Sequence, residues 1–164
     1  DLLLEAFEKI EDKELRLLVA GEFYNDKEQY RAALDRLGER VVLHEGFVKD
    51  EDIPAYFGAC DLFCMSSVYA TEAFGIVQIE AMSAGKPIVA TKISGSGVSW
   101  VNAHKESGLN VEPKDSEALA DAFMHILESE EDYQQFAEQS QQRYWAMFTK
   151  SKMIEKCVEI YKNL

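Results

Sequence analysis

Apolar residues follow two spacings along this chain, one typical of buried strands and the other of amphipathic helices. Short apolar runs predict strands at residues 15–21, 40–44, 61–65 and 87–91, with a last short strand at 109–111. Helical spacing predicts helices at residues 1–10, 26–37, 53–60 and 75–84. From residue 116 to the end the pattern is nearly all helical, in about three segments.

Strands that alternate with helices through short connections indicate an α/β domain with a mostly parallel sheet. We therefore predict a Rossmann-like, doubly wound fold with a helical C-terminal tail, forming one domain over residues 1–164. The helical pattern at residues 1–10 has no lead-in, so we expect this domain to be a fragment of a longer protein.

Composition narrows the class of protein. Of the residues, 47% are hydrophobic and 29% are charged, which is ordinary for a globular domain. The net charge of -13 disfavours nucleic acid as a partner, because phosphate backbones are bound through clustered Lys and Arg. No apolar run approaches the roughly 20 residues that span a bilayer, and no signal peptide opens the chain, so we expect a cytoplasmic protein.

Cysteines and histidines give no sign of a metal site. Cys60, Cys64 and Cys157 lack the spacing of zinc ligands, and we interpret them as buried, reduced thiols. The three histidines are scattered and match no metal motif. We expect neither a metal nor a cofactor.

The candidate chemistry lies in residues 72–80, which read Glu-Ala-Phe-Gly-Ile-Val-Gln-Ile-Glu. Glu72 and Glu80 stand eight residues apart around Gly75, the predicted start of a helix whose apolar residues cover most of its circumference. Those apolar residues are Ile76, Val77, Ile79, Ala81, Met82 and Ala84. The pattern predicts a largely buried helix, in which a carboxylate needs an interaction that offsets its desolvation.

Exposed amides at the start of such a helix favour an anion, because the positive end of the helix dipole lies behind them. The amides expected to do this belong to Phe74, Gly75, Ile76 and Val77. Eight helical residues span roughly 12 Å, about the reach of a nucleotide sugar. The alternative is that Glu72 is a loop carboxylate and Glu80 a solvated helix position.

The motifs of this chain resemble those of a known family. Glu-x7-Glu at residues 72–80, followed by Ala-Met-x-Ala-Gly-x-Pro-Ile-Val-Ala-Thr at 81–91, is similar to the donor-site signature of group 1 retaining glycosyltransferases of the GT-B fold. Residues 17–21, 42–48 and 106–111 also match motifs of the C-terminal domain of that family, in the same order.

The resemblance implies the donor-binding domain of a retaining, hexosyltransferase-like enzyme of polysaccharide or glycolipid biosynthesis. Glu72 would contact the donor sugar near the reacting carbon, and the amides of residues 74–77 would hold the sugar and the diphosphate. Glu80 would bind the ribose hydroxyls, and the backbone of Phe47 and Val48 would pair with the nucleobase edge. The substrate would be a nucleotide-diphosphate sugar, with no further cofactor.

The resemblance also implies what lies outside these 164 residues. The family usually has a strand with an Arg, and then a Lys, upstream of the first helix here, and both neutralise the diphosphate. The N-terminal domain, which would bind the acceptor sugar or lipid-linked glycan, is missing as well. We therefore expect the isolated fragment to be inactive. A second possible location, besides the cytoplasm, is the membrane surface, which the protein would reach through the missing half. Residues 21–24 depart from the glycine-x-glycine turn of the family.

Two other functions remain as alternatives. The first is a non-catalytic α/β module that binds a nucleotide or a partner protein. The second, less favoured, is a glycosidase that uses Glu72 and Glu80 as acid and nucleophile, which requires carboxyl groups about 5–9 Å apart.

Two smaller features lie outside the motif. Residues 94–97, Ser-Gly-Ser-Gly, lack the third glycine of a dinucleotide fingerprint, and we interpret them as a flexible crevice loop that faces the missing domain. Aromatic residues of the helical tail have spacings suited to core packing or to contact with another domain. They are Tyr144, Trp145, Phe148 and Tyr161.

Overall fold

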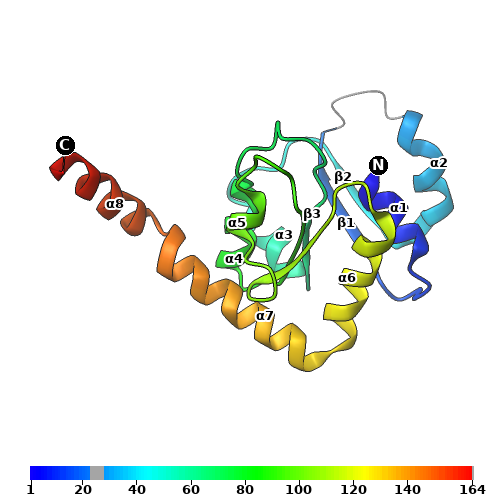
Figure 1. Cartoon of the computed structure of the whole chain (residues 1–164). Coiled ribbons are helices and arrows are strands. Elements are labelled where there is room, and N and C mark those ends of the chain that lie inside the picture. Colours follow the sequence, from blue (N-terminus) through cyan, green and yellow to red (C-terminus); the bar gives the residue numbers. More distant parts are fainter. Residues whose placement is uncertain (23–27, 164) are drawn as a thin grey trace.

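The computed structural model describes residues 1–22 and 28–163, in which strands and helices alternate as the apolar pattern predicts (Figure 1). The strands are β1 (Leu17–Gly21), β2 (Val41–Glu45), β3 (Phe63–Met65), β4 (Ile88–Thr91) and β5 (Gly108–Val111). The helices before β5 are α1 (Leu2–Lys9), α2 (Glu28–Leu37), the 3₁₀ turn η1 (Gly38–Arg40), α3 (Ile53–Ala59), α4 (Ile76–Ser83) and α5 (Val98–Val101). The tail contains α6 (Ser116–Glu128), α7 (Glu130–Arg143), the π-helical turn η2 (Tyr144–Phe148) and α8 (Lys150–Lys162).

The described strands pair only in parallel, but they form two sheets rather than one. In the first sheet β1 pairs with β2, from Leu17 opposite Val41 to Gly21 opposite Glu45. In the second sheet β4 lies between β3 and β5. The prediction of a parallel α/β domain is confirmed, with a break in the sheet between β1 and β3.

Helices cover both faces of the second sheet. All four residues of β4 are buried, as expected for a central parallel strand with helices on either side. Because side chains alternate along a strand, Val89 joins a cluster with residues of α1 and α6, while Ile88 and Ala90 join another with residues of α4 and α5. This two-sided packing makes the fold doubly wound.

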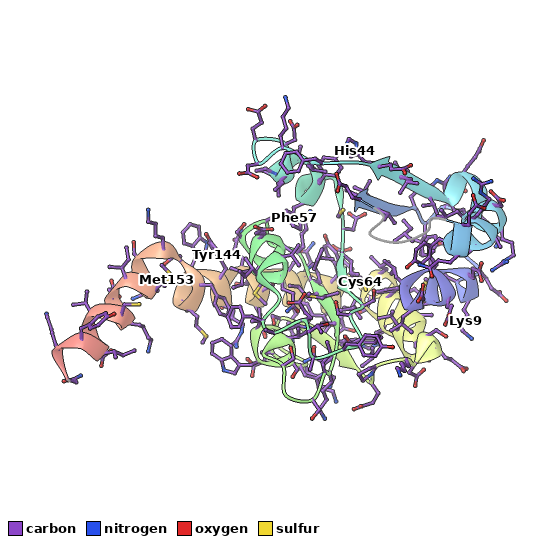
Figure 2. All side chains as sticks on the ribbon, turned by 90° about the horizontal axis from the view of Figure 1, so that it is seen from above. Lys9, His44, Phe57, Cys64, Tyr144 and Met153 are labelled. Atoms are coloured by element: carbon purple, nitrogen blue, oxygen red, sulfur yellow. The ribbon has the colours of Figure 1, made fainter. Side chains whose placement is uncertain are left out.

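The break between the sheets contains a cavity of about 690 Å³. Residues 18–21 of β1 line it from one side, and Phe63 and Cys64 of β3 line it from the other. Consecutive residues of a strand point to opposite faces, so an unbroken run of lining residues means that the strand presents its edge to the cavity. Neither edge pairs with another strand in the described ranges. In Figure 2 the labelled residue His44 marks the first sheet, through β2, and Cys64 marks the second sheet, through β3.

The last helix, α8, projects away from the rest of the molecule (Figure 1), and its residues are exposed throughout. The prediction of core packing for the tail aromatics is confirmed for Tyr144 and Phe148, which pack against the cluster around α4 and α5. It is wrong for Trp145 and Tyr161, which are 62% and 79% exposed, because Trp145 lies on the outer side of η2 and Tyr161 on the projecting α8. A contact of these two residues with another domain stays a prediction.

Candidate functional site

The helix of the Glu72–Glu80 motif begins where the sequence predicted. Gly75 is its N-cap, with φ 80° and ψ 56°, a left-handed conformation that glycine adopts without steric cost. The first helical residue is Ile76, so Glu80 lies about one turn inside α4. Glu72 precedes the helix, and the estimate of 12 Å for eight helical residues therefore does not apply.

The helix α4 is buried on one face only. Its buried residues are Gln78, Ala81 and Met82, whereas Ile76 is 67% exposed and Glu80 is exposed too. The prediction that Ile76 and Glu80 lie in a buried surface is wrong, because no described element covers that side of the helix. The Glu80 carboxylate is solvated and makes no hydrogen bond or ion pair with the described residues.

Glu72 holds the turn in front of the helix. Its Oε1 accepts a hydrogen bond of 2.9 Å from the Gly75 amide, so this amide, which we predicted to face a ligand, already has a partner. The amides of Phe74, Ile76 and Val77 have no acceptor among the described residues. Three of the four predicted amides are thus available at the positive end of α4.

The cavity between the two sheets brings four of the predicted site residues together. Phe47 and Val48, in the turn after β2, line it with Val77 and Glu80 of α4. The turn is tied to β1, since the Gly46 amide donates a hydrogen bond of 3.0 Å to the Gly21 carbonyl. Glu72, Phe74, Gly75 and Ile76 are not among the residues that line the cavity.

The charged side chains that line the cavity, among the described residues, are acidic. Its charged lining residues are Glu22 and Glu80, and no Lys or Arg is among the described residues that line it. An anionic ligand here would therefore need positive charge from elsewhere, beyond the partial charge of helix amides. Residues 23 and 24, where the chain departs from the family's glycine turn, lie outside the described residues.

The loop at residues 94–97, which we expected to be a flexible crevice loop, is hydrogen-bonded to the motif. The Ser96 hydroxyl donates to the Glu72 carbonyl at 2.5 Å, and the Gly97 amide donates to the Ala73 carbonyl at 2.7 Å. Gln78, fully buried in α4, donates from Nε2 to the Val98 carbonyl at 3.3 Å. Neither Ser96 nor Gln78 was predicted as a site residue, although a Gln within an otherwise apolar helix pattern is a signal of a buried polar contact.

The cysteines differ from the prediction in one case. Cys60 and Cys64 are half-buried and line the cavity, whereas Cys157 lies on exposed α8, so its predicted burial is wrong. Burial raises the pKa of the Cys64 thiol far above its ordinary value, and burial is also the main cause that raises the pKa of Cys60. A raised pKa disfavours the thiolate, which is the reactive form of a cysteine, at both positions. Within the described ranges, no cluster of His, Cys, Asp or Glu is suited to a metal ion.

The described part of the chain contains no helix long and apolar enough to cross a bilayer. Comparison with protein families matches residues 1–143 to the family described as glycosyl transferases group 1.

Curated relatives match nearly the whole chain. O-antigen chain mannosyltransferase C of Escherichia coli is 32% identical over 163 residues, which is 99% of this chain and 43% of the relative. Mannosylfructose-phosphate synthase of Agrobacterium fabrum is 35% identical over 161 residues, 91% of this chain and 34% of the relative. The chain therefore spans less than half the length of these relatives.

Solved structures share the fold. A crystal structure of Anabaena Alr3699/HepE in complex with UDP-glucose superposes with a TM-score of 0.85 at 25% identity, over 99% of this chain and 44% of that protein. Sucrose-phosphate synthase of Thermosynechococcus elongatus superposes with a TM-score of 0.83 at 25% identity, over 99% and 41%.

Proposed function

This chain belongs to the glycosyl transferases group 1 family, and we propose that it is the donor-binding domain of a retaining enzyme that transfers a sugar from a nucleotide-diphosphate sugar to an acceptor hydroxyl. One observation carries the proposal. Two segments that stand far apart in the sequence line the same cavity, the first with Phe47 and Val48 and the second with Val77 and Glu80. A concave site with a few polar groups on a largely apolar lining is the usual form of a small-molecule site.

Glu80 is suited to the ribose of the donor. Its carboxylate is exposed, has no partner among the described residues and reaches the cavity. Each carboxylate oxygen can accept a charge-assisted hydrogen bond from one hydroxyl of a diol. In this assignment, the exposed turn at Phe47 and Val48 takes the nucleobase edge.

The other end of the donor would lie at the turn before α4. The open amides of Phe74, Ile76 and Val77 would bind the diphosphate and stabilise the negative charge that develops as it leaves. The Oε1 of Glu72 accepts a hydrogen bond from Gly75, and no described residue donates a hydrogen bond to its Oε2, which would accept one from a hydroxyl of the sugar. Glu72 would thus position the sugar rather than act as a nucleophile.

In this proposal the site is completed by parts from outside these 164 residues. No Lys or Arg among the described residues lines the cavity, and in the same ranges the edges of β1 and β3 face it without a strand partner. We propose that an extended segment from outside these residues pairs with both edges, joins the two sheets and brings basic side chains. We propose that a further domain binds the acceptor, a sugar or a lipid-linked glycan. The name of one relative, O-antigen chain mannosyltransferase C, supports a glycan acceptor.

The glycosidase alternative gains no support from the geometry. Glu80 lines the cavity and Glu72 does not, whereas a glycosidase places both carboxyl groups about the same scissile bond. No observation favours a non-catalytic module over the donor site.

The proposal is tested with the full-length polypeptide that contains this chain. We expect transfer of sugar from one nucleotide sugar of a UDP, GDP and ADP series, with retained anomeric configuration in the product, read by NMR. The isolated 164 residues should transfer none. Inverted products would contradict the retaining mechanism, and transfer by the isolated chain would contradict the need for a second domain.

A further inference from the structure

The segment that follows β4 is hydrogen-bonded to the turn that carries Glu72. The Ser96 hydroxyl donates to the Glu72 main-chain carbonyl at 2.5 Å and accepts from the Val98 amide at 3.2 Å. The Gly97 amide donates to the carbonyl of Ala73 at 2.7 Å. Two successive carbonyls of the Glu72 turn are therefore held by a loop 24 residues further along the chain.

The same loop is bonded to α4 through Gln78. This side chain is completely buried, and its Nε2 donates to the Val98 carbonyl at 3.3 Å. Its amide also lies directly against Gly75, because a Cβ placed on Gly75 would meet Gln78 Nε2 at 2.4 Å. Gly75 in turn donates its amide to the Glu72 carboxylate at 2.9 Å.

These contacts close a ring that runs from Glu72 through Gly75, Gln78, Val98 and Ser96 back to Glu72. We propose that Ser96 is a positioning residue for the transfer reaction, which fixes the backbone of Glu72 and thereby the direction of its carboxylate. The inference rests on the proposed function, in which Glu72 contacts the donor sugar. Without the hydroxyl, the Glu72 carbonyl and the Val98 amide each lose a partner, and the turn is held less firmly, although the bond from Gly97 to the Ala73 carbonyl remains.

Small displacements of a positioning group have large effects on rate. Ser96 lies at the sugar end of the proposed donor, whereas Glu80, assigned to the ribose, is on the open side of α4 and is not part of the ring. Ile76 and Val77, whose amides are assigned to the diphosphate, lie within α4. Loss of the Ser96 hydroxyl should therefore slow transfer more than it weakens the binding of a nucleoside diphosphate, which lacks the sugar.

The test compares Ser96→Ala with Ser96→Thr, which keeps the hydroxyl, in the full-length polypeptide. Ser94→Ala is the matched control, because Ser94 is exposed and makes no hydrogen bond in the described ranges. We expect Ser96→Ala to lower kcat about 10- to 100-fold, Ser96→Thr to restore most of it and Ser94→Ala to match the wild type. If Ser96→Ala does not fold, Ser96→Cys replaces it as a near-isosteric variant with a weak donor.

A second measurement does not depend on catalysis. Hydrogen exchange of the Gly75 amide, read by NMR, should be about 5- to 30-fold faster in Ser96→Ala than in the wild type or in Ser94→Ala. Unchanged exchange would overturn the inference, and so would faster exchange with unchanged kcat. Wild-type protein that transfers no sugar from any donor would refute the proposed function, while the Gly75 exchange would still decide whether Ser96 orders the Glu72 turn.

Discussion

Gly75 has a left-handed backbone conformation and lies in close contact with the side chains of Gln78 and Met65, so the effect of a Cβ on the free energy of unfolding can be predicted. At φ +80°, a Cβ on Gly75 would lie 2.4 Å from Gln78 Nε2 and 2.9 Å from Met65 Sδ. The conformation alone costs a non-glycine residue about 1–2 kcal/mol. Both neighbours are buried, so relief of the overlap adds about 1–3 kcal/mol of overpacking. Gly75→Ala should therefore lower the free energy of unfolding by about 2–5 kcal/mol.

Gly95 provides the matched control. Its φ of +78° is nearly the same, but a Cβ there would meet nothing within 4 Å. Gly95→Ala should cost about 1–2 kcal/mol, and the difference between the two variants isolates the steric overlap at the start of α4. Urea unfolding, followed by far-UV circular dichroism, measures both. Equal destabilisation of the two variants would refute the assignment of a tight contact between Gly75 and Gln78.

Three further predictions follow from the site and the sheet. Glu80→Ala should weaken nucleoside-diphosphate binding to the full-length polypeptide about 10- to 100-fold, from about 1.5–3 kcal/mol for charged hydrogen bonds; unchanged affinity by calorimetry, with exposed Glu159→Ala as control, would rule out the ribose role. Gly108→Ala should abolish cooperative unfolding, because its Cβ would lie 1.8 Å from the Ile88 carbonyl oxygen across the β4–β5 pair; a cooperative urea transition near the wild-type midpoint would contradict this. Because burial raises the pKa of Cys64 above its ordinary value of 9.0, the unfolded chain releases this proton first, and the free energy of unfolding should fall above pH 9 by up to about 1.4 kcal/mol per pH unit. Cys64→Ala should have a shallower slope in urea unfolding, and an equal slope would contradict the burial of the thiol.

The parallel α/β architecture could be predicted because its signals are local. Each described strand begins or ends within two residues of an apolar run in the sequence, and Gly75 marks the start of α4 as expected. The structure brings Phe47, Val48, Val77 and Glu80 to one cavity, and their roles in donor binding stay a prediction.

The features that could not be predicted depend on contacts between distant segments. The break between β1 and β3 reflects which strands meet, and an apolar run does not encode its neighbours. Ile76 is exposed because no described element covers its side of the helix, although its position in the apolar pattern matches that of buried residues. The bond from Ser96 to Glu72 joins a side chain to a main chain 24 residues away and has no periodic signal.

The central claim is that the cavity beside Glu80 binds the nucleotide portion of a sugar donor. It is tested most directly by the melting temperature of the full-length polypeptide with a panel of UDP-, GDP- and ADP-sugars, since a ligand of the native state stabilises in proportion to its occupancy. The account predicts that at least one of these donors raises the melting temperature of the wild type and that Glu80→Ala reduces the shift. If no nucleotide sugar raises it at millimolar concentration, or if Glu80→Ala shows the full shift, the assignment of this donor site is wrong.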